Sequence, residues 1–254
     1  MIGFFHKIRR QLAADSQFLK YSRYAIGEII LVVIGILIAL QLNNMNEKRK
    51  LKGEEIKILR NFQANLQEDL SHIEINIETF ETAKSSVNII LKHMQQNLPY
   101  TDTLACHFGN TTFLFSPGIN QGVFESLTSA DFNLITNDSI KHDITTYYSF
   151  VNNEFDVQIA RYSKIIEDAS KSVFNTRFDA MWNHEVSGSG GDLGCVEMIP
   201  NDYEGLKKDK EYNYFLRTLN NQLFWHRLGP LTIAKEYAEE LLERINKELN
   251  EHNQ

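Results

Sequence analysis

The chain has 254 residues and a mass of 29.4 kDa, which is enough for one large domain or two small ones. A hydrophobic share of 43% and a charged share of 23% exclude a wholly disordered chain, and two cysteines exclude a disulfide-rich scaffold. Only 4 prolines and 13 glycines argue against a turn-rich β-sandwich or barrel and favour helices.

Charge is distributed unevenly along the sequence. Residues 1–60 hold 11 Lys and Arg against 5 Asp and Glu, a net charge of +6, whereas the remaining residues hold 15 against 28, a net charge of −13. A basic, apolar beginning followed by an acidic body indicates membrane attachment. The acidic body also argues against nucleic acid as a partner.

One segment is apolar enough to cross a membrane. Residues 29–40 (IILVVIGILIAL) form an unbroken apolar run, which extends over 24–42 with only Glu28 and Gln41 as interruptions. The hydrocarbon core of a bilayer needs about 20 helical residues, and both polar side chains lie near the ends, where they can reach the interface. We therefore expect a transmembrane helix over 24–44; the alternatives are a buried core helix and a cleaved signal peptide.

The segment before the span, residues 1–23, predicts a second membrane feature. Its apolar residues recur at helical spacing beside basic ones, as in an amphipathic helix on an anionic membrane surface; a frayed tail is the alternative. Basic residues flank the span in nearly equal numbers on its two sides. Because moving a short basic tail across the membrane is unfavourable, we expect a cytoplasmic amino terminus and a soluble domain, residues 45–254, on the other side.

Three residues of the span are candidates for contacts inside the membrane. Gly35 and Ala39 form a pair of small residues four apart, which lets another helix approach closely. The Glu28 carboxylate has three alternatives: it is solvated at the interface, it contacts Arg23 or a partner helix, or it lines a polar path for ions or protons.

The soluble part predicts long helices. Apolar residues recur every three or four positions from Leu59 to Leu98, a spacing typical of a helix in a bundle or coiled coil, and Pro99 ends this helix. A second long helix is expected from the capping residues 137–139 to about Trp182. A third is expected from about 202–210 to Leu249, with a kink at Gly229-Pro230.

Between these helices, residues 103–119 predict an irregular connection that can include a short helix, and 122–129 predict a short helix. The sequence as a whole therefore predicts an all-α protein, in which a single transmembrane helix continues into an antiparallel bundle of long helices.

Several stretches together resemble a known family. They are FFHKIRRQL at 4–12, the block KYSRYAIGEIILVVIGILIALQLNN at 20–44, and FESLTSADFNLITNDSI at 124–140, which precedes Tyr147 and Tyr148. The chain resembles a bacterial family of single-pass membrane proteins of unknown function, domain-of-unknown-function family 6090. The resemblance implies a one-span anchor in the inner membrane with a helical periplasmic domain, and it implies no activity.

The sequence contains no catalytic constellation, so we predict a protein that is not an enzyme and uses no cofactor. His184, Glu185, Asp192 and Cys195 lie around a Gly/Ser-rich loop, but their spacing fits no zinc pattern, and we expect no metal site. Cys106 and Cys195 could form a disulfide in an oxidising compartment; two buried thiols are the alternative.

Three functions fit these features. The first is a membrane-anchored scaffold or interaction protein that uses its long helix for oligomerisation or partner binding. The second is a periplasmic sensor whose bundle binds a small molecule. The third is a subunit of an oligomeric channel or transport assembly with Glu28 near the pore. The expected partners are the lipid bilayer and either further copies of the chain or another membrane protein.

Overall fold

A computed structural model describes residues 16–181 and 197–251, with side chains described from residue 26 onward. Within these ranges the protein is all-α, and an isolated bridge joins Phe178 and Pro200. The predicted fold class is confirmed. The chain divides between Glu55 and Ile56 into two compact units, which are described separately.

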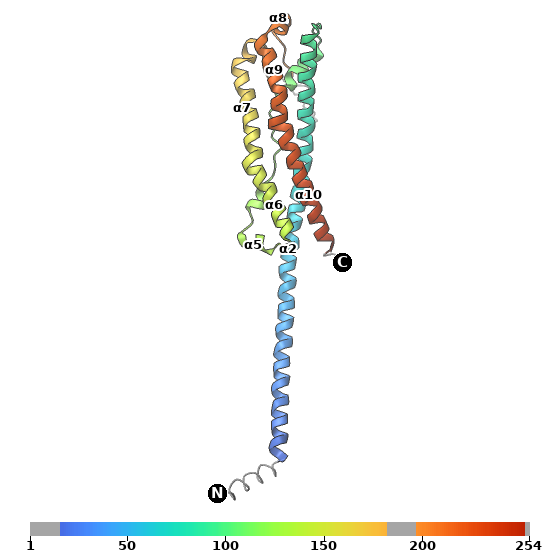
Figure 1. The fold of residues 1–254 in the computed structure, drawn as a ribbon, viewed down its shortest axis with the longest axis vertical. Helices are drawn as coiled ribbons and strands as arrows, with labels where there is room; N and C mark the ends of the chain where they lie inside the picture. The colour runs from blue at the N-terminus through green and yellow to red at the C-terminus, as the bar shows by residue number, and fades with distance from the viewer. Residues whose placement is uncertain (1–15, 182–196, 252–254) are drawn as a thin grey trace, which may run out of the picture. The chain divides into compact units, whose positions relative to one another are not determined.

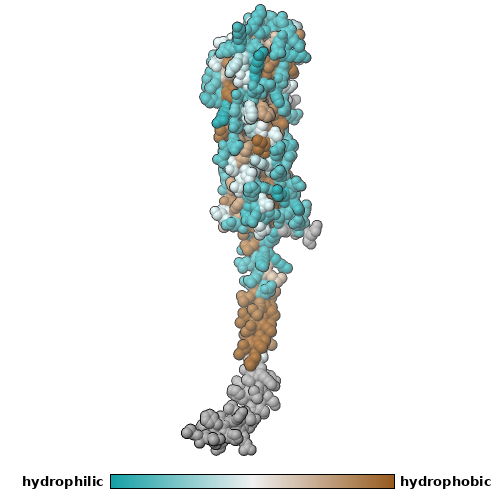
Figure 2. Space-filling view, in the orientation of Figure 1, coloured by the Kyte–Doolittle hydropathy of each residue, from teal (hydrophilic) through white to brown (hydrophobic). Residues whose placement is uncertain are grey.

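The first unit contains the amino-terminal part of helix α2, which runs over Ser16–Gln95 and contributes to both units. No proline interrupts the sequence of this helix. Between residues 26 and 42 its large apolar side chains are all exposed, and Figure 2 shows them as a continuous hydrophobic band. This part of α2 is long and apolar enough to cross a membrane.

The second unit is a bundle of long helices (Figure 1). Its long elements are the rest of α2, α6 (Asp138–Phe150) continuing through the π-helix η1 (Val151–Phe155) into α7 (Asp156–Ser172), and α9 (Lys210–Leu223) continuing through the π-helix η3 (Phe224–Leu228) into α10 (Gly229–Glu251). Its short helices are α3 (Thr103–Asn110), α4 (Gly122–Glu125), α5 (Ser129–Leu134), η2 (Phe174–Thr176) and α8 (Tyr203–Lys208).

Local side-chain chemistry sets the helix ends. After α2, Asn97 adopts a positive φ of 52°, and the N–H of Leu98 reaches back to the carbonyl of His93, which closes the helix in a Schellman motif ahead of Pro99. Asn137 caps α6 by accepting hydrogen bonds from two backbone N–H groups, as the sequence predicts. Asp209 caps α9 in the same way.

Two expectations about the helices need correction. The second long helix ends at Ser172, ten residues before Trp182, and it contains the π-turn η1. The helix expected over 122–129 ends at Glu125, whereas residues 103–110 form a short helix of the kind that the connection over 103–119 was expected to allow. A further helix, α5, was not predicted at all, although Thr128 and Asp131 form a capping box at its start.

The expected kink at Gly229-Pro230 takes the form of the π-helix η3. Pro230 has no N–H to donate to the preceding turn, so the helix widens there instead of continuing as α-helix. Gly229 favours this close turn, because a Cβ atom at that position would lie 3.0 Å from the carbonyl oxygen of Phe224.

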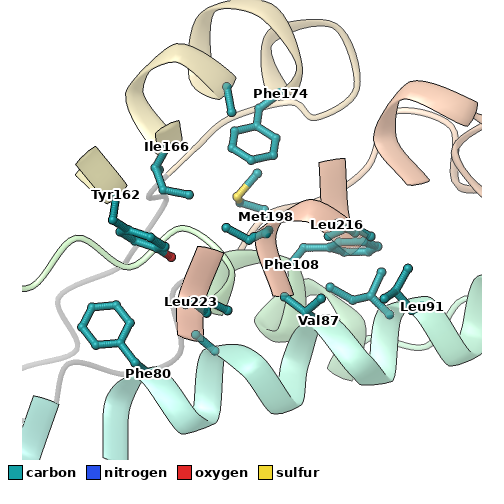
Figure 3. Close-up of a cluster of buried hydrophobic side chains, with 14 of the residues drawn as sticks. Phe80, Val87, Leu91, Phe108, Tyr162, Ile166, Phe174, Met198, Leu216 and Leu223 are labelled. Atoms are coloured by element: carbon teal, nitrogen blue, oxygen red, sulfur yellow. The ribbon is translucent and has the colours of Figure 1, made fainter. Parts of the chain in front are cut away.

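Two clusters of buried apolar side chains run along the bundle, and Figure 3 shows part of the larger one, in which Phe80, Val87 and Leu91 of α2 face residues of the other helices. Most of the predicted apolar stripe of α2 is buried. The buried face is wider than that stripe, however. It also includes the polar residues Asn65, Asp69 and Asn76, which the sequence did not single out.

Candidate functional site

The span candidates all lie on the apolar part of α2. Glu28, Gly35 and Ala39 are exposed, and a Cβ atom built on Gly35 would meet no atom of the chain within 4 Å. The surface around this small-residue pair is therefore open to a second helix. The side chain of Arg23, one of the alternative contacts considered for Glu28, lies outside the described side chains.

A buried carboxylate is the centre of a polar network inside the bundle. Asp69 is fully buried and accepts three hydrogen bonds: from the backbone N–H of Asn120 (2.9 Å), from the hydroxyl of Tyr147 (3.0 Å) and from Nδ2 of Asn65 (3.1 Å). Asn65 also donates to the hydroxyl of Tyr148, and the Tyr148 ring stacks on Phe124 at 4.6 Å.

Burial controls the protonation of this network. Desolvation raises the pKa of Asp69 above its ordinary value of 3.8, although the hydrogen bonds from Asn120 and Tyr147 act in the opposite direction. Burial, followed by the nearby charge of Asp69, raises the pKa of both Tyr147 and Tyr148. The tyrosines therefore stay protonated and act as hydrogen-bond donors. Because the Asp69 oxygens are occupied by these partners, the network is suited to holding the bundle together rather than to binding a substrate.

A second buried charge lies in η3. The Arg227 guanidinium is sandwiched between two rings, with its Cζ atom 4.8 Å from the centre of Phe80 and 4.7 Å from that of Tyr162. It donates to the carbonyl of Phe115 (3.0 Å) and to the hydroxyl of Ser163 (3.2 Å). Burial lowers the pKa of Arg227 to about 10. In the described part of the chain no carboxylate pairs with it, so the rings and the carbonyl stabilise its charge.

The two buried charges hold the same connecting segment. Arg227 binds the carbonyl of Phe115, and Asp69 binds the N–H of Asn120, so residues 115–120 are fixed against α2 and η3 at both ends. The turn between them contains Pro117, which is buried, and Gly118, which is exposed and whose φ of +64° favours glycine.

A groove of about 450 Å³ lies between this segment and α2. Helix α2 contributes His72, Ile75, Asn76 and Thr79, and residues 115–118 form the opposite wall. Two buried polar atoms of these lining residues, Oδ1 of Asn76 and Nδ1 of His72, have no hydrogen-bond partner. Buried polar atoms are nearly always paired in proteins, so this groove is the candidate binding site of the bundle.

The remaining predicted site residues are placed as follows. His184, Glu185, Asp192 and Cys195 lie outside the described residues, and the described part of the chain contains no cluster suited to a metal ion. No cysteine in the described ranges is free, and Cys106 is partly buried in α3. The pairing of Cys106 with Cys195 stays a prediction.

Comparison with known families decides where the chain belongs. Residues 28–178, more than half of the chain, match a family of unknown function, DUF6090. The chain belongs to DUF6090. The predicted resemblance is thereby confirmed at the level of the family. The DUF6090 region includes the apolar part of α2 and Asp69 with its partners, whereas Arg227 lies beyond its end. No curated protein and no solved structure matches the chain.

Sequence reasoning missed the polar residues that shape the bundle interior, although the sequence holds a signal for each. Asn65, Asp69 and Asn76 recur at helical spacing beside the apolar stripe of α2, which places them on its buried flank. Arg227 follows the buried Leu219 and Leu223 at the same spacing. Spacing alone does not decide burial, however, because Lys84 is also in step with the stripe of α2 and is only half-buried.

Proposed function

We propose that the protein is anchored in the bacterial inner membrane by one helix over residues 24–44 and acts there as a non-enzymatic scaffold or interaction protein. Residues 1–23 then lie on the cytoplasmic membrane surface, and 45–254 form a periplasmic domain. The partners are the bilayer and a second copy or another membrane protein. The exposed apolar surface of α2 between Ile26 and Leu42 carries this proposal.

This surface supports lipid rather than water or protein as its environment. Twelve large apolar side chains between Ile26 and Leu42 are about half exposed or more. Full burial of one such side chain is worth about 1.5–3 kcal/mol, and soluble monomers rarely expose apolar patches of more than a few hundred Å². The apolar residues are consecutive and therefore face all sides of the helix. A single protein partner covers one side only, whereas lipid tails cover them all.

Exposed aromatic side chains support the interaction role. Phe224 and Trp225 of η3 pack edge to face at 5.2 Å and are 49% and 67% exposed. Tyr214 of α9 is also exposed. Aromatic residues are enriched in protein interfaces and depleted from ordinary surfaces. We infer that this part of α9 and η3 contacts a partner protein.

The use of titratable groups supports a non-enzymatic role. Three of the buried ones, Asp69 and the two tyrosines beside it, are joined by hydrogen bonds to one another, to Asn65 and to the backbone. Catalytic groups, in contrast, have to reach a substrate. The buried groups of this bundle stabilise its helices against one another.

Membrane extraction tests the anchor. Full-length protein expressed in a Gram-negative host should remain in the pellet after carbonate washing and ultracentrifugation. Ile34→Arg places a charge at the middle of the span at a cost of about 3 kcal/mol and should release part of the protein, whereas Leu42→Arg at the end of the apolar segment should not. Release of the unaltered chain into the supernatant would contradict the proposal.

Two further measurements test orientation and partner binding. Protease added to spheroplasts should digest residues 45–254, and protection of this domain would contradict the proposed topology. Cross-linking in mild detergent should capture a partner or a second copy. Trp225→Ala should weaken this capture, while Lys164→Ala, which alters an exposed charge on α7, should not. Equal capture by both variants would exclude the aromatic pair as the contact.

The sensor function is a second candidate, because one observation favours it. The groove beside α2 contains buried polar atoms without partners. Such atoms occur elsewhere in the bundle too, for example the hydroxyls of Tyr162 and Tyr212, but here two of them belong to neighbouring residues that line a groove of ligand size.

A further inference from the structure

We propose that the groove between residues 72–79 of α2 and residues 115–118 binds a neutral, apolar ligand that carries a secondary amide. The proposal deepens the sensor function and rests on it. Its test measures ligand binding directly, so its failure is distinguishable from a failure of the membrane anchor.

The orientation of the Asn76 amide fixes what the ligand has to offer. Nδ2 of Asn76 donates to the backbone carbonyl of His72 at 2.8 Å. The amide cannot be flipped, because Oδ1 would then face that carbonyl oxygen. Oδ1 therefore stays without a partner, although the side chain is only 6% exposed. It accepts hydrogen bonds only, so a ligand has to supply an N–H or O–H group.

His72 adds a second polar atom one helical turn away. Its Nδ1 is buried and also has no partner. In the tautomer with a proton on Nδ1 it is a donor, and residues four apart on a helix share a face. Two residues that line the groove one helical turn apart then supply one acceptor and one donor. A secondary amide matches this pair, since its N–H can bind Asn76 and its carbonyl oxygen can bind His72.

The walls of the groove determine the rest of the ligand. Ile75 is 59% exposed and Phe115 46% exposed, and Pro117 adds further apolar surface. The volume of about 450 Å³ falls in the range of small-molecule sites. Both polar atoms have almost no solvent-accessible surface in this conformation, so a ligand has to displace neighbouring groups to reach them.

The charges behind the groove favour a neutral ligand. The segment that forms one wall is held by Asp69 at one end and by Arg227 at the other. These buried charges have opposite signs, so neither an anion nor a cation is favoured over the whole groove.

The experiment compares ligands that differ in one atom. Acetanilide contains an aromatic ring and a secondary amide, and phenyl acetate has the same shape with an ester oxygen in place of the N–H. N-acetyl-leucine methylamide represents a peptide source of the same amide chemistry. Binding to the full chain in detergent micelles is followed by NMR through the side-chain signals of His72 and Asn76. We expect a dissociation constant on the order of millimolar for the small probe.

Variants identify the contact. Asn76→Leu keeps the volume but removes the acceptor, and Ile75→Trp fills the groove at an exposed position; each should weaken acetanilide binding at least about tenfold. Asn61→Leu alters an exposed asparagine of α2 and should bind as the unaltered chain does. The Tm of Asn76→Leu should also equal or exceed that of the unaltered chain, because an unpaired polar atom has been removed.

The outcomes separate the possibilities. Tighter binding of acetanilide than of phenyl acetate, with the difference lost in Asn76→Leu, supports the proposal. If N-acetyl-leucine methylamide binds more tightly than acetanilide in the same assay, the natural ligand is a peptide. If acetanilide binds more tightly, the natural ligand is a small molecule. Equal binding of ester and amide, unchanged binding in Ile75→Trp, or no saturable binding of any probe overturns the proposal.

Discussion

Arg227 and Asp69, far apart in the sequence, hold opposite ends of one short segment. The guanidinium binds the carbonyl of Phe115, and the carboxylate binds the N–H of Asn120. A backbone segment inside a bundle has polar groups that no helix satisfies. Here the buried cation donates a hydrogen bond to a carbonyl, and the buried anion accepts one from an N–H. Each charge is therefore paired with a backbone group of complementary polarity. The segment between them forms one wall of the groove.

The first prediction concerns the pH dependence of stability through Asp69. Its pKa is raised in the folded chain above the 3.8 of the unfolded chain, mainly by burial. The folded state therefore binds more protons than the unfolded state in the window above pH 3.8, and the free energy of unfolding falls as the pH rises through the raised pKa. The free energy of unfolding of the unaltered chain, minus that of Asp69→Asn, should therefore increase as the pH falls from neutral towards 3.8. Urea unfolding in detergent measures this difference.

Asp209 provides the matched control, since the Arg177 hydrogen bond lowers the pKa of its carboxylate below 3.8. The Asp209 carboxylate stabilises the fold at any pH above its pKa in the unfolded chain. This stabilisation is lost as the pH falls through its lower pKa in the folded chain. The stability difference between the unaltered chain and Asp209→Asn should therefore shrink in acid. A shift of the same sign for both variants would contradict the assignment of these protonation states.

A second prediction concerns the shape of the buried cation. Arg227→Lys retains the charge but loses the planar stacking on Phe80 and Tyr162, and it buries a more strongly hydrated ammonium group. We expect a loss of about 3 kcal/mol. Arg227→Met removes the charge as well; the Phe115 carbonyl and the Ser163 hydroxyl each lose this donor, although Ser163 still donates to the carbonyl of Ile159, and we expect a cost of about 1–2 kcal/mol. Thermal unfolding should give a lower Tm for Arg227→Lys than for Arg227→Met. The reverse order would show that the charge itself stabilises the bundle.

How far the sequence predicts this structure depends on the kind of signal each part carries. The exposed band of α2 and its buried stripe follow from apolar residues at regular spacing, which composition and periodicity express directly. The segment over 115–120 does not. Its path is fixed by hydrogen bonds to Asp69 and Arg227, which lie 51 and 112 positions from the residues they bind. Pairing over such distances leaves no local pattern in the sequence.

The groove could not be predicted from the sequence for the same reason. It exists because residues 115–118 pack beside α2, and two polar atoms of its lining residues are buried without partners. That property belongs to the folded chain. The π-turns were also hidden, since Pro230 predicts a local defect in the helix but not its form.

The third prediction concerns the disulfide between Cys106 and Cys195. The N–H of Met198 donates to the carbonyl of Ala105 at 3.0 Å, so a residue three positions after Cys195 lies beside the neighbour of Cys106. Three residues span about 10 Å at most, which brings the second cysteine within reach. Protein isolated without reductant should resist alkylation at both cysteines, and reduction should lower its stability by up to about 4 kcal/mol.

Single replacements test the same bond. Cys106→Ser and Cys195→Ser should each lower the Tm by the same amount as the double replacement, because either one removes the whole cross-link. Alkylation of both cysteines in the unreduced protein would contradict the disulfide.

The last prediction concerns association through the span. A leucine at Gly35 or Ala39 should weaken self-association about tenfold, since close approach of two helices depends on small residues at their contact. The open space around Gly35 means that Gly35→Leu meets no atom of its own chain, so any effect arises between chains. Val33→Leu is the control, because it enlarges a side chain two positions from Gly35, on the opposite side of the helix. Energy transfer between labelled copies in lipid bilayers should fall for Gly35→Leu and remain for Val33→Leu; equal transfer in all variants would assign the contact to a different face.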